Sequence, residues 1–233
     1  MKRVLLFTVV VLCFAASAFC GDGEWTTDIT PYFWMAGQNG DAVVLGQPAE
    51  IDISFSDVIS NFDMGLAGHL EANKNRCTLL FDFQYINVSD KPDTVEIRVK
   101  NTVLEGGGAY RLHPSFEAIG GVRIVNYKVE LTPDLIEPIE KSKTWVDPFI
   151  GGRAKAKIAD NFSVSARFDI GGFGVGSDFS WNLILGGSYD LKRVSLMFGY
   201  RAWNVDYDSG ERLRELKLDL TTSGPFVGIT FHM

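Results

Sequence analysis

The stretch Phe162-Ser-Val-Ser-Ala-Arg-Phe-Asp-Ile-Gly-Gly172 decides the fold of this chain. Every second position is apolar, and the positions between them are polar. The apolar set is Phe162, Val164, Ala166, Phe168 and Ile170, and the polar set is Ser163, Ser165, Arg167 and Asp169. Such alternation predicts a β-strand with two unlike faces. In a soluble sandwich the apolar face would point inward. In an outer-membrane barrel it would face lipid, and the polar face would line the lumen.

The same alternation recurs along the chain and predicts an all-β fold. We expect ten long strands, over 25–35, 64–72, 77–88, 95–110, 116–131, 144–158, 162–172, 180–189, 194–205 and a last strand that runs to Met233. Eight or twelve strands are the alternatives, depending on 42–54, where two short runs around Gly46-Gln-Pro48 predict a small hairpin. Because an open edge in lipid would leave unpaired backbone groups, the strands should close into an antiparallel transmembrane β-barrel.

The connections between strands alternate in length. Those near 73–76, 111–115, 159–161 and 190–192 are tight, and those near 89–94, 132–142, 174–179 and 207–213 are longer and more polar. Short periplasmic turns and longer external loops are typical of outer-membrane barrels, and both termini fall at the short-turn end.

Two glycine-containing stretches and one segment with helical spacing predict local departures from regular strands. Gly37-Gln-Asn-Gly40 predicts a turn, and Gly106-Gly-Gly108 predicts a kink or bulge. The helical spacing of 55–62 predicts a short loop helix, and the region 42–62 would either cap the barrel mouth or plug the lumen.

The N-terminus has the form of a secretory signal peptide over 1–18. Lys2 and Arg3 precede an apolar run, and Ala16-Ser-Ala18 supplies a cleavage site. The signal predicts Sec-type export, with 19–233 as one barrel domain in the outer membrane. Cys20 and Cys77 could pair in an oxidising periplasm, but Cys77 falls on an apolar strand face, and we expect no disulfide framework.

The net charge of -7 disfavours nucleic acid as a partner. The expected partners are outer-membrane lipid, lipopolysaccharide, and the barrel assembly machinery acting on the C-terminal strand. The sequence indicates no oligomeric state.

Several motifs resemble a family of uncharacterised Gram-negative outer-membrane β-barrel proteins, broadly similar to OmpA-like and OmpW-like small barrels. The matching stretches are Phe55-Ser-Asp-Val-Ile-Ser-Asn-Phe-Asp63, Trp145-Val-Asp-Pro-Phe-Ile-Gly151, Asp169-Ile-Gly-Gly-Phe-Gly-Val-Gly-Ser-Asp178, Gly199-Tyr-Arg-Ala-Trp-Asn-Val-Asp-Tyr207 and Gly224-Pro-Phe-Val-Gly228. The resemblance implies the fold and no settled activity. The chain departs from the usual aromatic C-terminal residue, since it ends in Phe231-His-Met233.

Charged residues at mid-strand positions should point into the lumen. They are Glu71, Asp82, Glu105, Glu117, Arg123, Asp147, Arg153, Arg167, Asp169 and Arg201. A barrel of eight to ten strands has a narrow interior, so we expect these charges to form a mutual salt-bridge network. The favoured function is structural, or small-solute passage through a charge-networked lumen. A narrow gated pore for small solutes is the alternative.

A lipid- or peptide-modifying enzyme is the least favoured alternative, because catalysis would require a histidine close to Ser, Asp or Glu. His113 and His232 fall at the periplasmic end, and only His69, beside Glu71, could approach the lumen. Its favoured interpretation is a packed member of the charge network. No metal-ligand spacing or phosphate-binding loop appears in the sequence, so we expect no catalytic residues, cofactor or metal.

Overall fold

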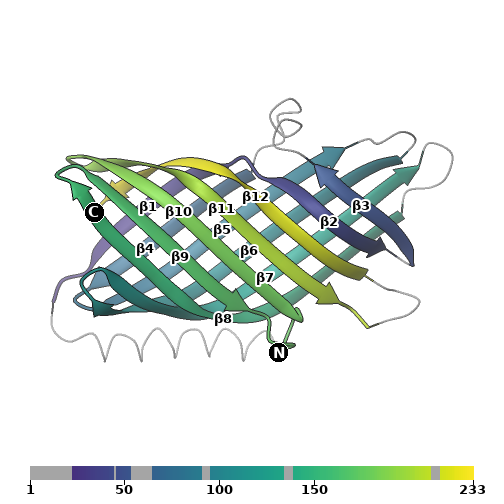
Figure 1. Ribbon diagram of the computed structural model, residues 1–233, viewed down its shortest axis with the longest axis horizontal. Helices are drawn as coiled ribbons and strands as arrows, with labels where there is room; N and C mark the ends of the chain where they lie inside the picture. The colour runs from purple at the N-terminus through teal and green to yellow at the C-terminus, as the bar shows by residue number, and fades with distance from the viewer. Residues whose placement is uncertain (1–22, 45, 54–64, 91–94, 134–138, 211–215) are drawn as a thin grey trace.

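The computed structural model describes residues 23–44, 46–53, 65–90, 95–133, 139–210 and 216–233. In these ranges the chain forms β-strands (Figure 1). The strands are β1 (Thr26–Trp34), β2 (Gly37–Val44), β3 (Gln47–Ile53), β4 (Gly65–Lys74), β5 (Cys77–Asp90), β6 (Val95–His113), β7 (Phe116–Pro133), β8 (Ile139–Ala159), β9 (Phe162–Gly171), β10 (Phe179–Leu191), β11 (Val194–Asp208) and β12 (Leu216–His232). The signal peptide expected over 1–18 and the helix expected over 55–62 lie outside the described residues. No helix in the described ranges is long and apolar enough to cross a membrane.

Ten of these strands close into an antiparallel barrel, as predicted. β1 pairs with β4 on one side and with β12 on the other, and β4 to β12 follow one another around the wall. The β2–β3 hairpin is an addition to this barrel. It pairs with the first half of β12, whereas β1 pairs with the second half.

The turn predicted at Gly37 to Gly40 is wrong, because these residues begin β2. Gly40 pairs with Leu220 of β12 and has a φ of 139°. A Cβ at Gly40 would lie 2.0 Å from the carbonyl oxygen of Asp219, so this glycine permits a close strand contact in place of a turn.

The other glycine prediction also needs correction. β6 and β7 pair in continuous register past Gly106 to Gly108, and the register shift lies between Arg111 and His113. Gly107 and Gly108 of β6 face Gly121 and Gly120 of β7, so the two backbones approach without a bulge. Cys77 is disulfide-bonded, contrary to the expectation of no disulfide framework, and its partner lies outside the described residues.

The two ends of the barrel differ as the loop lengths predicted. Two-residue turns join β4 to β5, β6 to β7, β8 to β9 and β10 to β11. The C-terminus lies at this short-turn end, on the left in Figure 1, and the β2–β3 hairpin lies at the opposite end.

Several strands are too long for the membrane alone. A spanning strand needs about 9–11 residues, and β8 has 21 while β6 has 19. At the loop end these long strands continue as two facing sheets, β5–β6–β7–β8 and β3–β2–β12–β11. We call this part the extension.

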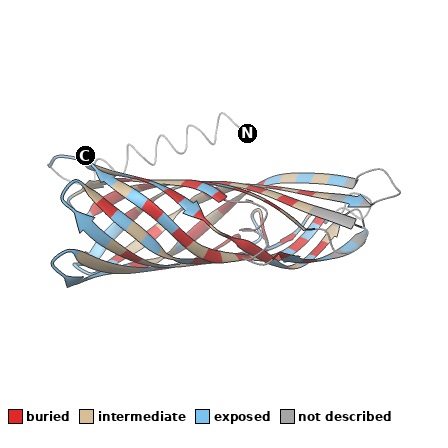
Figure 2. Cartoon of the chain, turned by 90° about the horizontal axis from the view of Figure 1, so that it is seen from above, coloured by how far each residue is buried: buried red, intermediate tan, exposed pale blue. Residues whose placement is uncertain are grey.

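The polarity of the wall inverts where the extension begins. Nearer the short-turn end, large apolar side chains are exposed on the outside, among them Phe33, Phe168 and Val227, at 49%, 51% and 48%. In the extension, apolar side chains point inward and charged ones point out. The burial pattern along the strands in Figure 2 follows this alternation. The barrel therefore presents a lipid-facing belt nearer the short-turn end and a water-facing surface around the extension.

Adjacent apolar residues mark each inversion. In Val103-Leu104 of β6, Val103 is 2% exposed inside and Leu104 is 37% exposed outside. Phe226-Val227 of β12 behaves in the same way. A doublet of apolar residues shifts the alternation by one position, so the apolar face changes side while the strand continues straight.

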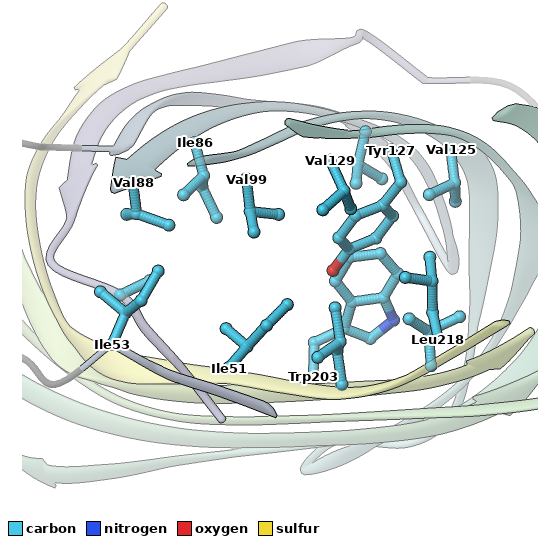
Figure 3. Close-up of a cluster of buried hydrophobic side chains, with 14 of the residues drawn as sticks. Ile51, Ile53, Ile86, Val88, Val99, Val125, Tyr127, Val129, Trp203 and Leu218 are labelled. Atoms are coloured by element: carbon cyan, nitrogen blue, oxygen red, sulfur yellow. The ribbon is translucent and has the colours of Figure 1, made fainter. Parts of the chain in front are cut away.

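The inside of the extension is an apolar core between the two sheets (Figure 3). Ile86, Val99 and Val129 from one sheet face Ile51 and Leu218 from the other. Aromatic rings join the sheets toward one side of this core. Tyr127 of β7 contacts Trp203 of β11 at 6.2 Å, and Trp145 of β8 stacks on Tyr207 of β11 at 4.2 Å, both between ring centroids.

Asp206 on the outer face of the extension should make stability depend on pH. Its pKa is raised by burial and by the charges of Asp219, Asp178 and Asp208. A carboxyl whose pKa is raised by folding destabilises the folded state above that pKa, and this cost disappears as the pH falls. Asp206→Asn should therefore raise the urea midpoint at pH 7, with a smaller gain near pH 4.

Asp208→Asn is the matched control, because its effect should have the opposite sign. The backbone N–H of Gly210 and the ammonium group of Lys217 lower the pKa of Asp208. This carboxylate therefore stabilises the fold at pH 7, and its loss should lower the midpoint there. Equal gains for Asp206→Asn at pH 4 and pH 7 would show that charge is not the cause.

Candidate functional site

A layer of ion pairs crosses the lumen at the level of the apolar belt. At its centre lie two arginines and two carboxylates from β6, β7 and β9. Arg123 donates from Nε to Glu105 at 2.8 Å and from Nη2 to Asp169. Arg167 donates to the same two carboxylates, at 2.6 Å to Glu105 and 2.9 Å to Asp169. Each arginine thus bridges both acids, and the four side chains are almost fully buried.

A second group continues the layer toward β1. The guanidinium of Arg201 lies 3.4 Å from a carboxylate oxygen of Asp82 and donates to the hydroxyl of Tyr32 at 3.1 Å. Its Nε donates to the side-chain oxygen of Asn182 at 3.0 Å. Asn182 in turn donates to Asp169 at 2.9 Å. The amide therefore links this group to the four central residues.

A third group lies toward the short-turn end. Arg153 contacts Glu117 at 2.6 Å and also pairs with Glu71. Between Glu71 and Asp82 lies His69, with one ring nitrogen 3.0 Å from Glu71 and the other 3.1 Å from Asp82. A neutral imidazole donates from only one nitrogen. The contact of both nitrogens with carboxylates therefore fits the protonated imidazolium.

The three groups balance in charge when His69 is protonated. Their acids are Glu71, Asp82, Glu105, Glu117 and Asp169, and their cations are His69, Arg123, Arg153, Arg167 and Arg201. Buried charges are costly unless they are paired and hydrogen-bonded. This arrangement pairs each of them, and we refer to these ten residues as the charge network. The more exposed Arg111 and Lys155 lie at its edge, 3.6 Å from Glu117 and Glu71 respectively.

Asp147 was predicted in the network but lies apart from it. It is fully buried, and it accepts hydrogen bonds from Trp145 Nε1 at 3.0 Å and from the backbone N–H of Ser177 at 2.7 Å. The hydroxyl of Ser177 donates to it at 2.7 Å as well. Asp147 therefore holds the β9–β10 loop over the wall at the base of the extension. The other nine predicted residues are all in the charge network.

A cavity of about 480 Å³ fills the lumen on the short-turn side of the network. His69, Glu71, Asp82, Arg153 and Arg167 contribute network groups to its wall. Apolar side chains line other parts of it: Ile184, Met197 and Phe226. We call this space the vestibule. Toward the loop end, the charge network closes the vestibule, and the apolar core of the extension lies beyond the network.

The rim of the vestibule holds a polar cluster that the sequence analysis did not identify. Asp28 of β1, Ser195 of β11 and His232 of β12 all line the cavity. The hydroxyl oxygen of Ser195 lies 2.7 Å from His232 Nε2, and His232 Nδ1 lies 2.7 Å from Asp28 Oδ1. These residues are far apart in sequence, and only the closure of β1 against β12 brings them together.

The sequence matches no protein-family model and no curated protein. In structure the chain is similar to the outer membrane protease OmpT from Escherichia coli, with a TM-score of 0.56 and 8% identity over 92% of this chain and 100% of that one. It is also similar to Ail, the attachment invasion locus protein of Yersinia pestis, with a TM-score of 0.46 and 10% identity over 91% and 100%. A third similar structure is Neisserial surface protein A, with a TM-score of 0.40 and 10% identity over 91% and 98%. The fold is that of a bacterial outer-membrane β-barrel, in agreement with the exposed apolar belt.

Proposed function

We propose that this protein is an outer-membrane barrel whose lumen is closed to solutes and whose role is structural. The observation that carries the proposal is the pair of internal layers, one of ion pairs and one of apolar side chains. A narrow barrel filled by side chains does not leave an aqueous channel. An ion-selective pore would need a ring of charges of one sign, which favours ions of the other sign. The charge network instead contains both signs in equal number.

The lipid-facing belt and the C-terminal strand support the partners expected from the sequence. Phe231 is 44% exposed on the outer face of β12, and β12 closes the barrel against β1. We propose that lipid and lipopolysaccharide surround the belt. The assembly machinery would read the last strand through its alternating apolar residues, even though the terminal residue is Met233.

A planar-bilayer conductance measurement tests the closed barrel. The purified protein, with folding confirmed by heat-modifiable migration and β-rich circular dichroism, should give a silent membrane. A barrel with this network has no open path for ions until several ion pairs separate. Stable, repeated openings from the same folded sample would contradict the proposal.

A narrow gated pore is the second candidate, and one observation favours it. Gln84 Oε1, Arg123 Nη1 and Ser180 Oγ are buried without a hydrogen-bond partner among the described residues. Buried polar groups of this kind usually bind internal water. Water in the network would lower the cost of exchanging ion-pair partners. If openings occur, Arg167→Ala or Asp169→Ala should change their size or frequency.

A further inference from the structure

We propose that Ser195, His232 and Asp28 form a catalytic triad that hydrolyses carboxylic esters at the vestibule rim. The order of contacts is that of a nucleophile, a base and an orienting acid, with both oxygen–nitrogen distances at 2.7 Å. A triad is recognised by this geometry and not by the order of its residues in the sequence. The proposal does not depend on whether the lumen conducts.

Asp28 selects the tautomer that a general base requires. A carboxylate can only accept, so His232 carries its proton on Nδ1, and the neutral ring leaves the lone pair of Nε2 toward Ser195. Asp28 is itself held, because Asn73 donates to its other oxygen at 3.3 Å. Thr78 donates to the side-chain oxygen of Asn73 at 2.7 Å. A chain of hydrogen bonds therefore fixes the acid from behind.

The backbone holds His232 in place by pairing on both sides. Its N–H donates to the carbonyl of Arg193 at 3.2 Å, and the next residue, Met233, exchanges two backbone hydrogen bonds with Thr27 at 2.8 and 2.9 Å. A base carried on paired strands keeps its geometry better than one on a loop. The His232 side chain is still 43% exposed, which leaves one side of the ring open to solvent.

The surroundings indicate the class of substrate. The vestibule offers Ile184, Met197 and Phe226 to an apolar acyl chain, and it meets the rim at Ser195. Thr230, the register partner of Ser195, lines the same cavity and is a candidate donor for the carbonyl oxygen. An ester with an apolar acyl group, entering from the short-turn end, fits this arrangement.

The reaction transfers the acyl group to Ser195 and then to water. The oxygen of Ser195 bonds to the carbonyl carbon while its proton passes to His232 Nε2. The ester C–O bond then breaks, and the leaving alcohol takes that proton. Water attacks the acyl-serine by the same route, which releases a carboxylic acid and restores the hydroxyl.

The effect of replacing Asp190 on ester hydrolysis distinguishes catalysis from a purely structural role. Its Oδ1 lies 2.7 Å from the Ser195 oxygen and competes with His232 for the single hydroxyl proton. It also places a negative charge beside the oxygen that attacks. Asp190→Asn should therefore increase ester hydrolysis severalfold, whereas a cluster that only fastens the strands would show no gain in hydrolysis.

The test uses a fluorophosphonate probe and p-nitrophenyl butyrate with the folded protein in an ester-free detergent. The probe should label Ser195, as located by mass spectrometry, and hydrolysis should follow saturation kinetics. Ser195→Ala and His232→Ala should each lower kcat by at least about a hundredfold, since triad members act as a unit. His113→Ala is the matched control, because His113 is an exposed histidine at the end of β6 and does not line the vestibule.

A folded wild-type protein that is neither labelled at Ser195 nor active on the ester would overturn the triad. Activity that survives Ser195→Ala in a heat-modifiable, folded variant would do the same. If a variant does not fold, the position of the label in the wild type and the Asp190→Asn rate still decide the matter.

Discussion

Arg123→Met should destabilise the barrel by about 3–5 kcal/mol, the cost typical of breaking a buried ion pair by removing one partner. The side chain of Arg123 is 1% exposed and pairs with both Glu105 and Asp169. Its guanidinium also lies 4.4 Å from the centre of the Phe149 ring. Methionine approximates the volume but leaves both carboxylates with Arg167 as their remaining arginine. Urea unfolding of the protein in lipid vesicles measures the loss.

Two further variants show whether Arg123→Met loses stability because buried carboxylates are left without their cation. Lys128→Met removes two ion pairs on the outer face, where Lys128 lies 2.8 Å from Glu130 and 2.9 Å from Glu140, and its effect should be much smaller. Adding Glu105→Gln to Arg123→Met should recover part of the stability, because it removes the excess negative charge that two carboxylates sharing one arginine would carry. A single variant as stable as the wild type would show that the network is hydrated enough to tolerate a missing cation.

Most of the charge network could be predicted from the sequence, since a charge on the polar face of a spanning strand can point only into the lumen. Which charges meet could not be predicted. Arg153 and Glu71 are 82 positions apart, and their contact depends on tilt and register around the whole barrel. Asp147 shares the alternation of its strand, but the adjacent loop supplies its donors through Ser177. Loop geometry of that kind is not encoded in a period-two pattern.

The extension was missed although the sequence carries its signal. A soluble sandwich and a membrane barrel were alternatives in the sequence, and the chain combines the two in the same strands. On β6 and β12 the pattern changes side at Val103-Leu104 and Phe226-Val227. An apolar doublet inside a strict alternation marks this change. The rim cluster had no comparable signal, because His232 and Asp28 are 204 positions apart.

Trp203→Ala should cost about 3–5 kcal/mol, as expected when a large buried side chain is truncated. Trp203 is 2% exposed, lies between the two sheets of the extension, and contacts the ring of Tyr127. Tyr127 stacks on Trp145 at 5.8 Å, so the cavity would form at the centre of the aromatic group. Asn204→Ala, one position along on the outer face, should cost below about 1 kcal/mol, since its hydrogen bond to Asp219 is exposed and that to Thr221 is only partly buried. Urea unfolding in lipid vesicles compares the two variants.

Trp203→Ala also shows which of the two internal layers, the charge network or the apolar core, closes the lumen. Trp203 belongs to the apolar core, and the ion pairs of Arg123, Arg167 and Arg201 lie toward the short-turn side of it. Trp203→Ala should therefore lower stability while the planar bilayer remains silent, because the charge network still closes the lumen. Openings in Trp203→Ala with an intact network would show that the apolar core is the seal. Equal stability of Trp203→Ala and Asn204→Ala would instead contradict a packed core in the extension.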